Sequence, residues 1–141
     1  MGHIFFIAPT PDTNLDEISE WTLYWLLEHN LVPDTAIYNC HSVRQALAAI
    51  EAPLSIGEAP ALVVIDHSTP PREEIIAFAS QLRTCIPESW ILEVVPNDMP
   101  MPDAKENAFW VRKPVCKEDW IAVLDHVFFK AATPQWSASE K

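Results

Sequence analysis

Glycine is almost absent from this chain of 141 residues, which contains only 2 of them. Phosphate-binding loops of the GxGxxG and Walker A types need several glycines, because the backbone must approach the phosphate closely. The sequence therefore excludes both motifs. Long hydrophobic runs are also lacking, and no stretch approaches the roughly 20 apolar residues that cross a bilayer. The opening residues MGHIFFIAP lack the basic flank and the cleavage site of a signal peptide, so we expect no membrane partner.

Positive charge is scarce as well. The chain has 9 Lys and Arg against 20 Asp and Glu, which gives a net charge of −11. A nucleic-acid backbone would be repelled by this average charge, so we expect no nucleic-acid partner.

Cysteine and histidine occur in patterns that do not favour a metal site. The three cysteines are far apart and form no CxxC pair, which is typical of reduced thiols in a cytoplasm rather than of a disulfide framework or a zinc site. No two of the five histidines have the i, i+4 spacing of a helical metal site. We therefore predict a cytoplasmic protein with no metal and no cofactor. The three cysteines are Cys40, Cys85 and Cys116, and the five histidines are His3, His29, His41, His67 and His126.

Hydrophobic patterns predict five strands and four helices. Short apolar runs bounded by prolines are typical of strands, and apolar residues that recur every three or four positions are typical of helices. The run ALVVI is continuous rather than alternating, which indicates cover on both faces of the strand. The predicted strands are 3–8, 35–40, 61–65, 90–95 and 108–112. The predicted helices are 13–30, 42–52, 71–86 and 117–132.

The strict alternation of strands and helices predicts the fold class. Each helix is long enough to cross over between parallel strands, so we expect an α/β fold with a doubly wound, five-stranded parallel sheet. We expect one domain over residues 1–132 and a flexible tail at 133–141. Residues 96–107 carry three prolines within seven positions, which disfavours a full helix there. The residues concerned are Pro96, Pro100 and Pro102, and we expect Met99 and Met101 between them to be partly exposed.

Each predicted helix has an apolar face that should contact the sheet. In the helix 42–52, Ser42 is the expected N-cap. The residues expected to face inward are Leu15, Ile18, Thr22, Trp25, Leu26 and His29 in the first helix, Val43, Ala46, Leu47 and Ile50 in the second, Ile75, Ile76, Ala79 and Leu82 in the third, and Trp120, Leu124, Val127 and Phe128 in the last.

Two motifs then stand at strand ends, where open α/β sheets place their working sites. VVIDHSTPP ends the third strand at Asp66, and FWVRKPV ends the fifth strand at Lys113. Because the carboxyl ends of parallel strands meet at one edge, we expect Asp66, Lys113 and the loop 9–14 to converge.

With these motifs in this order, the chain resembles the receiver domain of two-component response regulators, a family with flavodoxin-like topology. The likeness spans residues 3 to about 131. It implies that Asp66 occupies the phosphoacceptor position, that Pro70 is the usual proline four residues later, and that Lys113 is the family's lysine. It also implies a cis peptide bond before Pro114. The counterpart of Trp110 in the family is an aromatic residue whose rotamer reports the switch.

The chain departs from the family at two chemical positions. Receivers place an acidic pair after the first strand, and here the matching residues are Ala8 and Pro9. They place Ser or Thr after the fourth strand, and here the residue is Val95. Phosphoryl transfer to a carboxylate needs a divalent cation and a lysine to neutralise the developing charge, so we predict that normal Mg²⁺-dependent phosphorylation is lost. Asp12 and Asp16 are nearby candidates to replace the missing pair.

The sequence therefore predicts a degenerate receiver, a stand-alone pseudo-receiver that is not an enzyme and acts through protein–protein contact in signalling. What survives of the site is expected to be an Asp66–Lys113 ion pair. The alternative is an atypical response regulator that a partner kinase phosphorylates at Asp66. A third possibility is a small-molecule binder at the strand ends, but no sequence motif indicates one. Hydrolysis is not indicated either, because neither Ser68 nor Cys116 has a recognisable base beside it. We expect His67 to face solvent at the strand end.

The predicted partner surface lies on the first helix. Leu23 and Leu27 form an i, i+4 pair that points away from the inward face, with Tyr24 beside them. A surface helix needs only one apolar stripe, and extra apolar residues indicate that a partner covers them. We expect a homodimer or a contact with another protein here; the alternative is that the last helix, with Phe129, buries part of this pair within the monomer.

Overall fold

The computed structural model describes residues 2–9, 13–96 and 108–129, and the fold is built from those ranges. Five strands form one parallel sheet in the order β2-β1-β3-β4-β5, as the alternation of strands and helices predicts. The strands are β1 (Gly2–Ile7), β2 (Thr35–Cys40), β3 (Leu62–Asp66), β4 (Trp90–Val95) and β5 (Ala108–Arg112). The helices are α1 (Thr13–Glu28), α2 (Val43–Ser55), α3 (Arg72–Cys85) and α4 (Lys117–Phe129).

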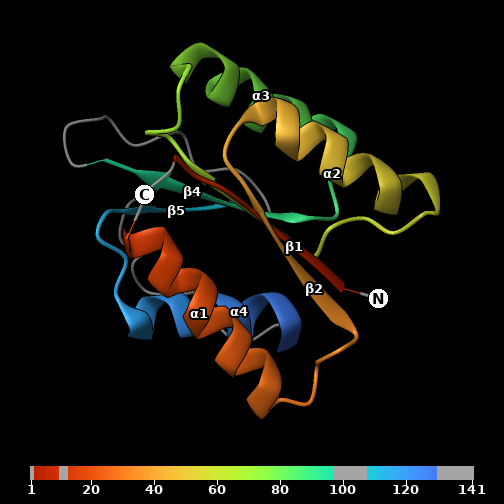
Figure 1. The fold of residues 1–141 in the computed structure, drawn as a ribbon, viewed down its shortest axis with the longest axis vertical. Coiled ribbons are helices and arrows are strands. Elements are labelled where there is room, and N and C mark those ends of the chain that lie inside the picture. Colours follow the sequence, from red (N-terminus) through yellow and green to blue (C-terminus); the bar gives the residue numbers. More distant parts are fainter. Residues whose placement is uncertain (1, 10–12, 97–107, 130–141) are drawn as a thin grey trace.

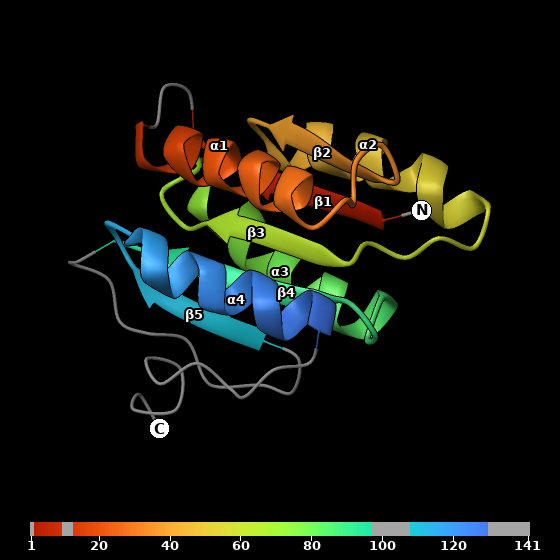
Figure 2. The same ribbon diagram turned by 90° about the horizontal axis from the view of Figure 1, so that it is seen from below.

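The sheet is covered on both faces, which explains the uninterrupted apolar run of β3. Helices α1 and α4 lie side by side on one face, and α2 and α3 lie on the other (Figures 1 and 2). Val64 contributes to the core beneath α1 and α4, whereas its neighbour Val63 contributes to the core beneath α2 and α3. Successive side chains of a strand point to opposite faces, so a strand between two layers must be apolar throughout.

The helix boundaries and faces agree with the sequence except at a few positions. Ser42 is the N-cap of α2, and its Oγ accepts a hydrogen bond from the Gln45 amide at 3.1 Å. Leu47, expected to face inward, is 44% exposed because it lies at the outer edge of α2. Ile76 is 50% exposed in the same way on α3. His29 is also exposed, although its ring packs against Trp25 with 4.3 Å between the ring centroids.

Several expectations concern segments that the structure does not describe. Irregular chain is predicted at 96–103, of which residues 97–103 lie outside the described residues, as do Met99, Met101 and the tail at 133–141. None of the described helices is long and apolar enough to cross a membrane.

The contact between α1 and α4 contains a buried hydrogen bond between side chains. The Nε1–H of Trp120 donates to Thr22 Oγ1 at 2.9 Å, and that hydroxyl donates to the Ile18 carbonyl at 2.7 Å. Thr22 and Trp120 are both fully buried. Neither group has water as an alternative partner, so the hydroxyl is needed to satisfy the indole.

Thr22→Val keeps the shape of the side chain but removes this acceptor. We expect the free energy of unfolding to fall by about 2 kcal/mol, since a buried indole N–H is left without a partner. Urea denaturation followed by tryptophan fluorescence measures the change. The matched control is Thr22→Ser, which keeps the hydroxyl and should cost only about 1 kcal/mol for the lost methyl group. A valine variant as stable as the wild type would show that the bond contributes nothing.

Candidate functional site at the carboxyl edge of the sheet

Asp66 is the last residue of β3, the central strand, and its side chain is fully buried. Lys113 follows β5, where its amide donates to the Val95 carbonyl at 3.0 Å. The Lys113 Nζ lies 2.6 Å from Asp66 Oδ2. The topology thus brings together the two residues that the sequence motifs placed at strand ends, and they form the expected ion pair.

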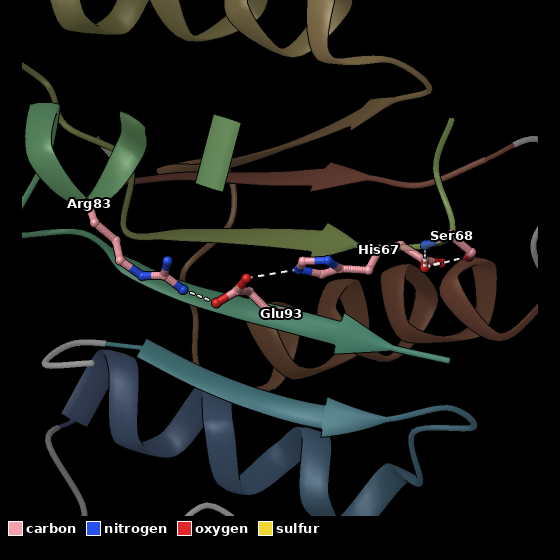
Figure 3. A network of polar contacts seen from close by, with 5 residues as sticks. His67, Ser68, Arg83 and Glu93 are labelled. Atoms are coloured by element: carbon pink, nitrogen blue, oxygen red, sulfur yellow. Dashed lines mark hydrogen bonds and ion pairs between the residues drawn. The ribbon is translucent and has the colours of Figure 1, made fainter. Parts of the chain in front are cut away.

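Ser68 holds the other oxygen of the same carboxylate. Its backbone N–H and its Oγ–H both donate to Asp66 Oδ1, at 2.9 and 2.6 Å (Figure 3). The Lys113 ammonium in turn donates to Ser68 Oγ at 3.2 Å. Ser68 therefore positions the carboxylate rather than acting as a nucleophile; the sequence signal for this role is its position two residues after an acid, which permits a local side-chain-to-backbone bond. Both carboxylate oxygens of Asp66 are therefore engaged within the chain.

The other predicted residues of the site lie at the same edge of the sheet, except Trp110, which lies in the middle of β5. Ala8 follows β1 and Val95 ends β4, and both are buried, whereas Pro9 is partly exposed. The Lys113–Pro114 peptide bond is cis, as the resemblance implies, and the ring of Pro114 is exposed. Trp110 lies within β5, 3% exposed, directly opposite Glu93 of β4. Every strand end except that of β2 thus supplies a predicted residue.

Among the residues of this edge that the structure describes, the donor set does not fit a magnesium ion. Mg²⁺ requires oxygen ligands, mainly carboxylates and water, in near-octahedral geometry. The residues after β1 are Ala8 and Pro9, whose side chains offer no oxygen, and both oxygens of Asp66 already have partners. Within the described ranges, no three His, Cys, Asp or Glu side chains come together as a metal site would require. Asp12 lies outside the described residues, and Asp16 lines a hollow between α1 and β2.

A second buried charge cluster begins at the residue next to Asp66. His67 Nε2 lies 2.8 Å from Glu93 Oε1, and Arg83 of α3 pairs with the other oxygen of Glu93 (Figure 3). His67 is 7% exposed and Glu93 is 2% exposed. The expectation that His67 faces solvent is therefore wrong. An acid inside the apolar run of β4 needs a buried partner, and that acid was the signal that sequence reasoning overlooked.

Burial keeps the pKa of His67 below its ordinary value, against a smaller opposing effect from the Asp66 carboxylate, while Arg72 and Arg83 lower it further. The physical reason is charge balance. Arg83 already neutralises Glu93, and Lys113 already neutralises Asp66. A proton added to His67 would be an uncompensated charge in a buried place.

Of the remaining candidates, Cys40 ends β2 and the His41 ring lies 3.1 Å from the Ala8 carbonyl oxygen, so both lie at the carboxyl edge, whereas His3 does not. His3 of β1 bonds to Tyr38 and Glu58 at the opposite end of the strand, and its 2.8 Å contact with Glu58 lowers the pKa of that carboxyl. The three cysteines are free thiols, of which Cys40 is buried. Burial raises the pKa of the Cys40 thiol, which disfavours the reactive thiolate.

Comparisons with known proteins support the fold. A scan against protein-family models and a search of curated proteins found no match. The structure of NtrX from Brucella abortus, in complex with ADP, aligns with 92% of this chain and 27% of its own, with a TM-score of 0.65 and 16% identity. A two-component response regulator from Cytophaga hutchinsonii aligns with 92% of this chain and 96% of its own, with a TM-score of 0.61 and 15% identity. This chain therefore spans only about a quarter of NtrX, and it shares the fold of response-regulator receivers.

Replacing Lys113 by Met should lower the stability of the fold, because the buried Asp66 carboxylate loses its cationic partner. Removing one partner of a buried ion pair leaves an uncompensated charge, so we expect a loss of about 3 kcal/mol in the free energy of unfolding at neutral pH. Chemical denaturation measures it. In Lys113→Met combined with Asp66→Asn, no buried charge remains, and most of the loss should be recovered. If the single variant costs less than about 0.5 kcal/mol, the pair behaves as an ordinary surface contact.

The lowered pKa of His67 predicts a pH dependence of stability. In the unfolded chain His67 binds a proton more readily than in the fold, so stability falls as pH decreases through the ordinary histidine range, and it rises again toward neutral pH. The measurement is the slope of unfolding free energy between about pH 5.5 and 7.5, a window around the ordinary histidine pKa. His67→Gln keeps a neutral donor for Glu93 and should flatten this slope. An unchanged slope would assign the titration to other groups.

Proposed function

We propose that the chain is a pseudo-receiver, a signalling protein that keeps the receiver scaffold and works through protein–protein contact without normal Mg²⁺-dependent phosphorylation of Asp66. The observation that carries the proposal is the engagement of both Asp66 oxygens, by Lys113 on one side and by Ser68 on the other. The fold shared with response-regulator structures supports the signalling role.

The chemistry of phosphoryl transfer supports this choice. A carboxylate that attacks a phosphoryl group must approach another anion, and the repulsion has to be cancelled by a cation and by fixed positive charge. Here Lys113 supplies one positive charge, but Ala8 and Pro9 supply no metal ligand. Val95 supplies no hydroxyl to bind the transferred group. An attack by Oδ1 would also require the loss of its bonds to Ser68.

The rest of the proposal follows from the same features. The chain is not an enzyme, because the groups at the strand ends are used in structural bonds. A cytoplasmic location is supported by the three free cysteines. The alternative, a response regulator phosphorylated at Asp66 by a partner kinase, is supported by the retained Asp66 and Lys113 and is separated from the proposal by the experiment below.

Incubation with acetyl phosphate and Mg²⁺, followed by intact-mass spectrometry, tests the proposal. We expect no phosphoryl adduct on the wild-type chain, because the negative charge at the site is not neutralised. A stoichiometric, hydroxylamine-sensitive adduct that disappears in Asp66→Asn would instead establish the phosphorylatable alternative.

A restored variant serves as the positive control. Ala8→Asp, Pro9→Asp and Val95→Thr together rebuild the three positions at which the chain departs from receivers, and Ser68→Ala removes the hydroxyl bond to Asp66 Oδ1 while the backbone amide bond remains. If the combined variant folds by circular dichroism and accepts phosphate, the missing groups account for the inactivity. Pro9→Asp alone is the milder variant, because Pro9 is partly exposed, whereas Ala8 and Val95 are buried.

A further inference from the structure

The outward face of α1 is made of two kinds of residue, apolar and acidic. Its C-terminal half exposes Leu23, Tyr24 and Leu27, which are 44%, 57% and 51% exposed. The rest of the face carries acids, and α1 contains no Lys or Arg. These acids are Asp16, Glu17, Glu20 and Glu28, all exposed.

The spacing along α1 places these residues in continuous rows. Asp16, Glu20, Leu23 and Leu27 follow one another at intervals of four, three and four residues, so they form one line along the helix. Tyr24 lies beside Leu27 on the side toward α4. The line therefore changes along its length from acidic to apolar, and a helical partner laid along α1 would meet both parts.

A hollow of about 420 Å³ lies between α1 and the edge strand β2, at the acidic end of this line. Asp16 and Glu20 supply carboxylates to its wall, and Leu23 and Ile37 supply apolar surface. Ser19 and Asn39 complete the lining, and the Ser19 hydroxyl donates to Asn39 Oδ1 at 3.4 Å. A long cationic side chain fits this combination, because its methylene stem can pack on Leu23 and Ile37 while its charged head meets the carboxylates.

The acids of α1 are not explained by helix stability alone. Asp16 lies in the first turn, where the helix dipole favours negative charge. Glu28 is the last residue of the helix, where the dipole disfavours it. Within the described ranges, the ion pairs of carboxylates involve Glu58, Asp66 and Glu93 and none of the acids of α1. These charges are therefore available to a partner.

The last helix does not cover the exposed leucines. Phe129 packs on Trp25 and His29, with ring centroids 5.5 and 5.3 Å away. Trp25 also donates its Nε1–H to Asp125 of α4 at 3.2 Å, which places α4 on the Trp25 side of α1. Leu23 lies on the other side, toward β2 and the hollow. Leu23 and Leu27 remain 44% and 51% exposed, which leaves a substantial part of this pair open to a partner.

We propose that this face of α1 binds a basic amphipathic helix of another protein, whose apolar residues cover Leu23, Tyr24 and Leu27 and whose lysine or arginine enters the hollow at Asp16 and Glu20. A second copy of this chain is a poorer occupant, because a two-fold contact through α1 would bring two sets of unpaired acids together. The inference rests on the proposed function in that it names the kind of partner that the module takes. Helix-in-groove recognition of this kind uses anchors at helical spacing.

The test is selection of binders to the purified full-length chain from a displayed library of helical peptides randomised on one face. Selection at about 150 mM salt keeps weak surface attraction screened. We expect the selected helices to carry an apolar stripe and basic residues. We expect Leu23→Ser with Leu27→Ser to weaken binding at least about tenfold, because two apolar contacts are removed. We expect Asp16→Lys with Glu20→Lys to weaken it by a similar factor.

Matched controls separate this face from general attraction to an acidic protein. Leu47→Ser with Leu54→Ser removes two leucines of similar exposure, 44% and 40%, from α2. Glu73→Lys with Glu74→Lys changes the net charge by the same amount as the reversal on α1, but on α3. Both control variants should bind the selected helices within about twofold of the wild type, since distant sites act independently.

Three results would overturn the inference. Selected helices without basic residues would contradict the charge argument, and helices that bind the α1 variants as well as the wild type would place the partner surface elsewhere. A wild-type dimer in light scattering that Leu23→Ser with Leu27→Ser dissociates would make a second copy the occupant. The phosphodonor experiment does not depend on any residue of α1. Its outcome therefore tests the proposed function independently of the binding experiment.

Discussion

Burial of the Asp66 carboxylate at the end of the central strand is the constraint on which the carboxyl edge of the sheet depends. An ionised group in that position is costly unless it is paired and hydrogen-bonded. The chain meets the requirement with Lys113 from the end of β5 and with the amide and hydroxyl of Ser68 from the loop after β3. The edge strand β5 is thereby linked to the central strand β3 by an ion pair, in addition to the backbone hydrogen bonds of the sheet.

A second buried acid is also paired with a cation, in the cluster that includes His67, the residue after Asp66. Glu93 is buried within β4, and Arg83 and His67 satisfy its two oxygens. Each of the two acids thus has one permanent cation, so a chain with a net charge of −11 keeps this buried edge balanced. His67 lies between the two ion pairs. Because both acids already have a cation, a proton on His67 would add an uncompensated charge, and its neutral form is favoured. The excess of acids is carried on the surface, including the outward face of α1.

Local sequence patterns predicted the elements and the meeting of Asp66 with Lys113, because both depend on rules that act over short distances or follow from topology. Continuous apolar runs identify strands of a sheet that is covered on both faces, and parallel strands bring their carboxyl ends to one edge. The partners of His67 were missed for a different reason: Glu93 and Arg83 reach it from another strand and from a helix, and only the packing of α3 on the sheet brings them together. Leu47 was misplaced because a helix of mostly apolar residues does not reveal from periodicity alone how wide its buried stripe is.

A phosphorylation switch and an interaction scaffold make opposite demands on the same fold. A switch needs two states close enough in free energy for a ligand or a modification to exchange their populations. A difference of about 3 kcal/mol between two states already leaves the less stable one below about 1% of the population. Breaking the contacts of Asp66 would leave a buried charge without its partner, and that cost is of this size. The arrangement at the strand ends therefore favours a single state, which agrees with the proposed role as a scaffold and with the proposed contact on the outer face of α1 rather than at the carboxyl edge of the sheet.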